Sequence, residues 1–134
     1  MNRSAAADSD EQLVRSRLTQ AYRDMKAGDI ERLLALYLPD ALIQGPAQPP
    51  IVGTAAIRAF WLARFERYHL QVEPEVHEVT GFGDIVVVRG RTAGVFSPRN
   101  GDPAVPVDSW FLQIYRRQAD GTLLFWRGVN GPNP

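Results

Sequence analysis

Residues 107–130 read VDSWFLQIYRRQADGTLLFWRGVN, and this stretch has the pattern of two long β-strands joined by a tight turn. Asp120 and Gly121 stand between two runs of apolar and aromatic residues. An Asp-Gly pair tolerates the positive φ angles that a short hairpin turn requires. The stretch therefore predicts an antiparallel β-hairpin.

One carboxylate, that of Asp108, lies among the apolar residues of the first predicted strand. A buried carboxylate without a partner is costly, so such a residue normally faces solvent, is paired, or takes part in chemistry. The role of Asp108 therefore depends on which face of the strand it occupies.

Further strands precede this hairpin. HLQVEPEVHEV, from residue 69, alternates apolar and polar residues at its start, and GFGD at residues 81–84 indicates a turn. IVVVRGRTAGVF, from residue 85, leads into a second hairpin signal, Asn100-Gly101. The later half of the chain is thus predicted to be a meander of long antiparallel strands.

Three helices are predicted before residue 69. Ser9 and Gln12 have the spacing of a capping box for the first, Asp29 can cap the second, which Pro39 ends, and Thr54 begins the third. Between the last two lie a short strand, ALIQG, and a proline-rich loop, PAQPP. Helices followed by an antiparallel sheet describe an α+β domain with the helices on one sheet face. Residues 1–8 are expected to be a disordered tail and residues 9–134 one domain.

Composition excludes several classes of function. The chain has 134 residues, with Lys plus Arg and Asp plus Glu both at 15, so its formal net charge is zero. Without a basic excess, neither nucleic acid nor an anionic membrane is an expected partner. The absence of cysteine removes disulfides, thiol nucleophiles and thiolate metal sites. A cytoplasmic protein is the simplest expectation.

His69, Glu73, Glu75 and His77 share one face of a predicted strand and raise the question of a metal site. At a rise of about 3.3 Å per residue, the two histidines of a straight strand lie roughly 26 Å apart and cannot share an ion. We therefore expect a solvated strand face and no metal, although a β-bulge would allow His77 alone to reach a pocket.

Three segments together resemble a known family: AGDIERLLALYLPDA, GTAAIRAFW, and the hairpin VDSWFLQIYRRQADGTLLFWRGVN. They are similar to the ketosteroid isomerase-like, or SnoaL-like (polyketide cyclase-like), branch of the NTF2-like superfamily. The resemblance covers residues 10–131. It implies an α+β roll shaped like a cone, in which three N-terminal helices pack on a strongly curved antiparallel sheet around a deep apolar pocket. That fold hosts many functions.

The resemblance carries only part of a known catalytic site. Steroid isomerases of this type use a carboxylate base, with a tyrosine and a protonated aspartic acid as oxyanion donors. On this sequence the base falls on Gly45 and the tyrosine on Ala21, next to Tyr22, whereas the aspartic acid falls on Asp108. With two of the three positions lost, steroid isomerisation by that mechanism is disfavoured.

If Asp108 faces the pocket, alternation places Trp110, Leu112 and Ile114 on the same face. The resemblance places Trp126, Gly128 and Asn130 inward as well. Desolvation in such a cavity is expected to raise the pKa of Asp108, making it an acid or a hydrogen-bond donor near neutral pH. The alternative is that Asp108 bonds the backbone or Asn130 and only orders the pocket.

The candidate catalytic residues are therefore Asp108, Tyr22 and Asn130. The candidate substrate-binding residues are mainly aromatic: Trp61, Phe60, Trp110, Trp126, Leu112 and Gly45. Aromatic residues at these spacings are also typical of an ordinary core, and Tyr22 fits the core stripe of the first helix equally well.

The opposite face of the sheet is also largely apolar, and the helices can cover only one face. We therefore expect a symmetric homodimer through the outer sheet face, and the resemblance implies the same. The expected interface residues are Phe111, Gln113, Tyr115, Phe125 and Arg127.

The leading hypothesis is an enzyme that moves a proton on an apolar, oxygenated small molecule, of isomerase, cyclase or dehydratase type, without a metal or organic cofactor. Epoxide hydrolysis ranks lower, since it needs an Asp-Arg-Asp arrangement and only Asp108, with Arg89 or Arg91 as helpers, is available. The rival hypotheses are a non-catalytic module that binds a hydrophobic ligand and a purely structural dimerisation domain.

Overall fold

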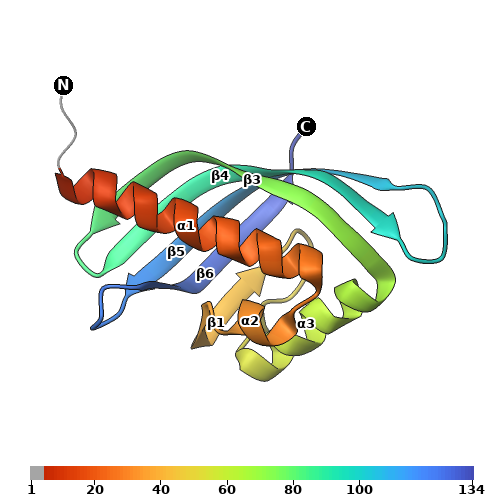
Figure 1. The fold of residues 1–134 in the computed structure, drawn as a ribbon, viewed down its shortest axis with the longest axis horizontal. Coiled ribbons are helices and arrows are strands. Elements are labelled where there is room, and N and C mark those ends of the chain that lie inside the picture. The colour runs from red at the N-terminus through yellow and green to blue at the C-terminus, as the bar shows by residue number, and fades with distance from the viewer. Residues whose placement is uncertain (1–4) are drawn as a thin grey trace.

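The structure, a computed structural model, describes residues 5–134, with side chains from residue 9 onwards. Three helices, α1 (Ala5–Ala27), α2 (Ile30–Leu34) and α3 (Thr54–Arg67), pack on a curled sheet of six strands (Figure 1). Over residues 5–134 no helix combines the length and the apolarity that a membrane span requires. The predicted α+β architecture is confirmed.

The sheet is open and mixed. Its strands are β1 (Tyr37–Gln44), β2 (Ile51–Val52), β3 (Tyr68–Phe82), β4 (Ile85–Pro98), β5 (Val105–Arg117) and β6 (Leu123–Pro132). Their spatial order is β2-β1-β6-β5-β4-β3, and all neighbours are antiparallel except β1 and β6, which run parallel. The meander from β3 to β6 therefore forms as predicted, with the short N-terminal strands added at its far edge.

Turn chemistry explains how the meander closes. Gly101 and Gly121 both have positive φ, 90° and 87°, in the turns between β4 and β5 and between β5 and β6. Gly83, with φ 64°, makes the tight turn between β3 and β4. Glycine adopts these angles at little steric cost, which is why the Asn-Gly and Asp-Gly signals were reliable.

Helix α1 lies along one face of the curled sheet (Figure 1). Val14, Leu18, Tyr22 and Met25 recur at helical spacing and are all buried. The helix begins at Ala5, so the capping box expected at Ser9 lies inside it, because the alanines before it favour a helix. Of the tail expected over residues 1–8, residues 1–4 lie outside the described residues.

The second helix is shorter than predicted. Asp29 caps it as expected, accepting from the Arg32 backbone N–H at 3.2 Å, but the helix ends at Leu34. Tyr37 and Pro39 belong to β1 instead. Proline lacks a backbone N–H, and β1 accommodates it because its ladder with β6 is interrupted between Tyr37 and Leu42.

The face assigned to β5 was wrong. Phe111 and Tyr115 are each 4% exposed and belong to the core, whereas Trp110 and Leu112 are 42% and 40% exposed on the outer face. The alternation itself was read correctly, but both faces of this strand are apolar, so the pattern alone did not show which one meets the helices.

A β-bulge in β6 explains a second difference. Tyr115 pairs with Phe125 and Ile114 with Arg127, which leaves Trp126 without an opposite residue. The bulge lets Phe125 and Gly128 both face inward although they are three residues apart. Trp126 instead donates from its indole N–H to Asp40 at 3.3 Å, away from the helices' side of the sheet.

Most of the residues expected at the dimer interface lie on the inner face of the sheet. Phe111, Tyr115 and Phe125 are buried in the core of one chain and are not accessible to a second copy. Gln113 also faces inward, so Arg127 alone of the expected residues lies toward the outer face, where it donates to the Asp40 carbonyl at 2.8 Å. The outer face carries Trp110, Leu112 and Val129 as its exposed apolar residues.

Candidate functional site

A cavity of about 420 Å³ lies between helices α1 and α3 and the inner face of the sheet. Pockets that bind small molecules in proteins have volumes of roughly 300–1,000 Å³. Its apolar wall is formed by Leu18, Ala21, Met25, Leu36, Ile43, Phe60, Trp61, Val72, Phe96, Val105, Pro106, Val107, Phe125, Gly128, Val129 and Pro132. Its polar residues are Arg17, Tyr22, Tyr37, Arg64, Thr92, Asp108, Ser109, Gln113, Tyr115 and Asn130.

Three phenols from three different elements converge on this cavity. Tyr22 of α1 shares a hydrogen bond of 2.5 Å with Thr92 Oγ1, and the Tyr115 hydroxyl of β5 donates to Gln113 Oε1 at 2.7 Å. The Tyr37 hydroxyl of β1 accepts from Trp61 Nε1 at 3.2 Å. Each hydroxyl is therefore held by a neighbour that also lines the cavity.

Burial raises the pKa of all three phenols above the ordinary value of 10.0. Desolvation is the largest cause in each case, because a phenolate is poorly stabilised away from water. All three groups consequently stay protonated at neutral pH. Tyr37, whose oxygen accepts from Trp61, keeps its own O–H available as a donor toward the cavity.

Two amides add further hydrogen-bonding capacity. Gln113 accepts from Tyr115 through its oxygen, and its NH₂ group makes no hydrogen bond with a described residue. Asn130 lines the cavity from β6 and likewise makes no side-chain hydrogen bond within residues 9–134. Its Oδ1 lies 3.8 Å from the position that a Cβ would take at Gly45. Gly45 thus lies beside the wall and does not belong to it.

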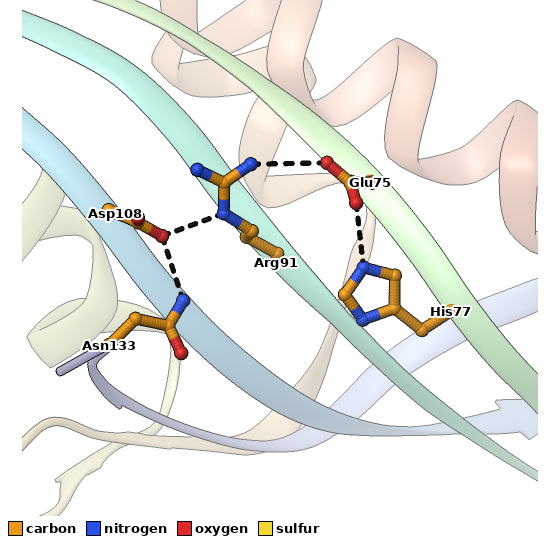
Figure 2. A network of polar contacts seen from close by, with 5 residues as sticks. All are labelled: Glu75, His77, Arg91, Asp108 and Asn133. Carbon is orange, nitrogen blue, oxygen red and sulfur yellow. Dashed lines mark hydrogen bonds and ion pairs between the residues drawn. The ribbon is translucent and has the colours of Figure 1, made fainter.

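Asp108 contributes to the rim of the cavity, but its carboxylate lies on the outer face of the sheet. It accepts from Arg91 Nε at 2.7 Å and from Asn133 Nδ2 at 2.8 Å, and its side chain is 51% exposed (Figure 2). Its neighbours on β5, Val107 and Ser109, face the cavity instead. Cross-strand register agrees, because Arg91 pairs with Trp110 on the outer face and Thr92 with Ser109 on the inner face.

The expected rise in the pKa of Asp108 was therefore wrong. The hydrogen bond from Arg91, assisted by that from Asn133, lowers the pKa of Asp108 from 3.8 to about 2. The carboxylate is ionised at neutral pH and can only accept hydrogen bonds. It is not the protonated acid that the resemblance implied.

The ion pair of Asp108 is part of a longer network across β3, β4 and β5 (Figure 2). Arg91 Nη1 also donates to Glu75 Oε2 at 3.2 Å, and His77 Nε2 lies 2.8 Å from Glu75 Oε1. His77 occupies a β-bulge between Val76 and Glu78, as the sequence allowed, yet it bonds to Glu75 and does not line the cavity. Among the described residues, no group of three acidic or histidine side chains is arranged to hold a metal.

The cavity therefore brings together some of the expected site residues and separates others. Tyr22, Asn130, Phe60 and Trp61 all line it. Three other expected residues do not line the cavity: Trp110 and Leu112, which lie on the outer face of the sheet, and Trp126, which lies at the bulge in β6.

Several lining residues were missed by the sequence reading: Arg17, Tyr37, Arg64, Thr92, Gln113 and Tyr115. Gln113 and Tyr115 lie two and four residues after Phe111 on the same strand and therefore on the same face. A correct assignment of the inner face of β5 would have predicted both as cavity residues. Thr92 would follow from its pairing with Ser109. Nothing in the local sequence around Arg64 or Tyr37 distinguishes them from surface or core residues.

Comparison with known proteins identifies relatives of the whole domain. The family model of the SnoaL-like domain matches residues 18–126. No curated protein sequence matches the chain. Among solved structures, a ketosteroid isomerase-like protein from Erwinia carotovora atroseptica superposes with a TM-score of 0.81 at 22% identity, covering 92% of this chain and 96% of that one.

Two further solved structures are similar. A candidate dehydratase of the NTF2-like family from Streptomyces avermitilis has a TM-score of 0.79 at 20% identity, covering 95% of this chain and 98% of its own. A candidate aromatic ring hydroxylase from Novosphingobium aromaticivorans has a TM-score of 0.80 at 20% identity, covering 94% and 90%. At these identities the likeness establishes the fold alone.

Proposed function

Because this chain belongs to the SnoaL-like domain family, we propose that it binds an apolar, oxygen-bearing small molecule in the cavity described above. The observation that carries the proposal is the convergence of three protonated phenols on a largely apolar cavity of about 420 Å³. Apolar walls favour a hydrophobic body, and a few fixed donors select an oxygen on it. A carbonyl, hydroxyl or lactone oxygen fits these donors.

The proposed roles follow from the contacts. Phe60 and Trp61 contact the apolar body, and Tyr37 donates to the ligand oxygen, while Asn130 offers an amide that no described residue occupies. Tyr22, held by Thr92, is a second donor at the α1 side of the cavity. A purely structural dimerisation domain would instead fill this space with side chains.

A second candidate function is turnover of the bound molecule by an isomerase, cyclase or dehydratase type of reaction. The 2.5 Å hydrogen bond between Tyr22 and Thr92 favours it, because a hydroxyl pair can pass a proton to or from a ligand oxygen. In this version Tyr22 replaces Asp108 as the proton donor, since the Asp108 carboxylate is ionised and bound to Arg91. Donors that polarise an oxygen lower the barrier when charge develops there.

The test is a thermal-shift screen of phenols, enones, steroids and lactones against the wild type, Tyr22→Phe and Tyr68→Phe. Tyr68 is a matched control, since it packs on Phe96 but does not line the cavity. A ligand of the native state raises the melting temperature. We expect Tyr22→Phe to weaken binding of carbonyl ligands by roughly 3–10-fold, the usual worth of one hydrogen bond, and Tyr68→Phe to have no effect.

Turnover is then measured by chromatography of each hit after incubation with catalytic amounts of protein. Conversion that falls at least roughly ten-fold in Tyr22→Phe would support the enzymatic version. Binding without conversion would leave the chain as a ligand-binding module. A screen without any hit, or equal losses in both tyrosine variants, would contradict the proposed site.

A further inference from the structure

Two arginines line the cavity without a hydrogen bond or an ion pair to any described residue: Arg17 and Arg64. The other half-buried arginines all have an oxygen partner, namely Arg58 with Glu31, Arg91 with Asp108, Arg117 with Asp10, and Arg127 with the Asp40 carbonyl. The half-buried cations without a partner are thus found at the cavity and not elsewhere in the described part of the chain.

Arg64 is held against the wall by aromatic rings. Its Cζ lies 4.4 Å from the ring centroid of Phe60 and 5.6 Å from that of Phe96, and both rings line the cavity. Contacts with ring faces stabilise the cation but do not occupy its N–H donors. The guanidinium therefore has donors to offer and a fixed position from which to offer them.

Burial makes this arrangement costly without an anion. Desolvation lowers the pKa of Arg64 from its usual value, which shows that the surroundings disfavour its charge. A guanidinium nevertheless keeps its proton in proteins, so the charge stays and its cost remains. An anion bound at the donors of Arg64 would offset that cost.

No carboxylate among residues 9–134 performs this function. Asp108 is the one acidic residue among the described residues that line the cavity, and its carboxylate is bound to Arg91 on the outer face. Arg17 interacts electrostatically with the Asp120 carboxylate, which does not line the cavity, whereas Arg64 has no carboxylate partner among the described residues.

We propose that the natural ligand is an apolar monocarboxylate whose carboxylate binds the guanidinium of Arg64 while its apolar body packs among Phe60, Trp61 and Phe96. The planar fork of an arginine matches a carboxylate with two parallel hydrogen bonds. The single positive charge of Arg64, held between apolar rings, suits one carboxylate, whereas a phosphate dianion normally requires several donors. This inference rests on the proposed function and narrows its class of ligand.

The test compares 2-naphthoate with 2-naphthamide, which have nearly the same shape but differ in charge. Dissociation constants are measured by isothermal titration calorimetry at pH 7 for the wild type, Arg64→Gln, Arg64→Lys and Arg67→Gln. Arg67 is the control, because it lies on the same helix and packs on Tyr68 but does not line the cavity. Circular dichroism without ligand checks that each variant is folded.

We expect the wild type and Arg67→Gln to bind 2-naphthoate at least roughly ten-fold more tightly than 2-naphthamide. Arg64→Gln should bind the two compounds equally, and Arg64→Lys should keep part of the preference because it keeps the charge. Equal binding by the wild type, or a preference that survives in Arg64→Gln, would overturn the inference. Arg17→Gln is measured in the same way. If Arg17→Gln loses the preference for 2-naphthoate and Arg64→Gln keeps it, Arg64 is not the residue that binds the carboxylate.

The outcomes separate this inference from the proposed function. If 2-naphthamide or neutral compounds from the screen bind but the acid has no advantage, the cavity binds ligands and the carboxylate class is wrong. If neither naphthalene compound nor any screened compound binds, the proposed function itself fails.

Discussion

Asp108 shows how a single side chain changes its chemistry with its partner. In the network of Figure 2 it accepts from Arg91 and Asn133, and its pKa falls from 3.8 to about 2. The same residue in an apolar cavity would have a raised pKa. Burial raises the pKa of Tyr22, Tyr37 and Tyr115, so all three phenols stay protonated at neutral pH. Tyr115 already donates its O–H to Gln113, so the donors that can act on a ligand are Tyr37 and, when it accepts from Thr92, Tyr22.

The lowered pKa of Asp108 predicts an acid-dependent contribution to stability. Because the folded pKa lies below the ordinary value, the ionised carboxylate stabilises the fold above about pH 4, and this contribution is lost as the pH falls from 3.8 to about 2. We expect Asp108→Asn to be less stable than the wild type at pH 7 and the difference to shrink toward pH 2. Urea unfolding at several pH values measures this.

Asp84→Asn is the matched control for that experiment, since the Asp84 carboxylate makes no hydrogen bond or ion pair with a described residue, although its backbone carbonyl accepts from Arg117. The free energy of unfolding of Asp84→Asn should equal that of the wild type at every pH. If the difference in the free energy of unfolding between the wild type and Asp108→Asn stays constant down to pH 2, the ion pair is not its cause.

At the scale of the elements, two β-bulges decide which side chains reach the cavity. The bulge at Trp126 keeps Phe125 and Gly128 on the inner face of β6, and the bulge at His77 brings that ring to Glu75 on the outer face. Beside the second bulge, Gly90 lets β4 approach its neighbours closely. A Cβ there would lie 2.3 Å from the Glu75 carbonyl oxygen and 2.6 Å from Phe111 Cζ.

Gly90→Ala should therefore destabilise the fold, because neither the backbone carbonyl of Glu75 nor the buried Phe111 ring can move freely. Overpacking of this kind lowers the free energy of unfolding by about 1–3 kcal/mol. Gly45→Ala is the control, since the nearest atom to its added Cβ is Asn130 Oδ1 at 3.8 Å, an ordinary contact. Equal urea midpoints for the two variants would show that β4 adjusts without cost.

At the scale of the molecule, the outer face of the sheet remains uncovered in one chain. Trp110 and Leu112 are exposed there, and the register places Leu112 directly opposite Val129, which is also exposed and in addition contributes to the rim of the cavity. Helices cover only the inner face (Figure 1). We propose that a second copy covers this apolar strip, which replaces the interface residues expected from the sequence.

Leu112→Glu tests this proposal, because a carboxylate in an apolar interface loses its hydration without gaining a partner. We expect the wild type to be a dimer in sedimentation velocity at micromolar concentration and Leu112→Glu to weaken the dimer at least roughly ten-fold. Phe82→Glu is the control, since Phe82 is 65% exposed at the far end of β3. A monomeric wild type, or a Leu112→Glu dimer of unchanged strength, would refute the interface.

The sequence by itself determined the elements and their order. The helical stripe of Val14, Leu18 and Tyr22, the cap at Asp29 and the glycine turns all follow local rules, which depend only on neighbours along the chain. The resemblance of three segments to the SnoaL-like family indicated the fold and the family. Of the site residues predicted from the sequence, Tyr22, Asn130, Phe60 and Trp61 line the cavity, and their roles stay predictions.

Only the tertiary structure decided which face of β5 is inside. Both faces of that strand are apolar, so the choice depends on where the helices lie and on the bulge at Trp126, neither of which has a local signal. The pairing of Asp108 with Arg91 and the cavity position of Arg64 depend likewise on residues brought together from different strands and helices. Charge and pKa follow from those distant partners, which is why the chemistry of the site required the fold.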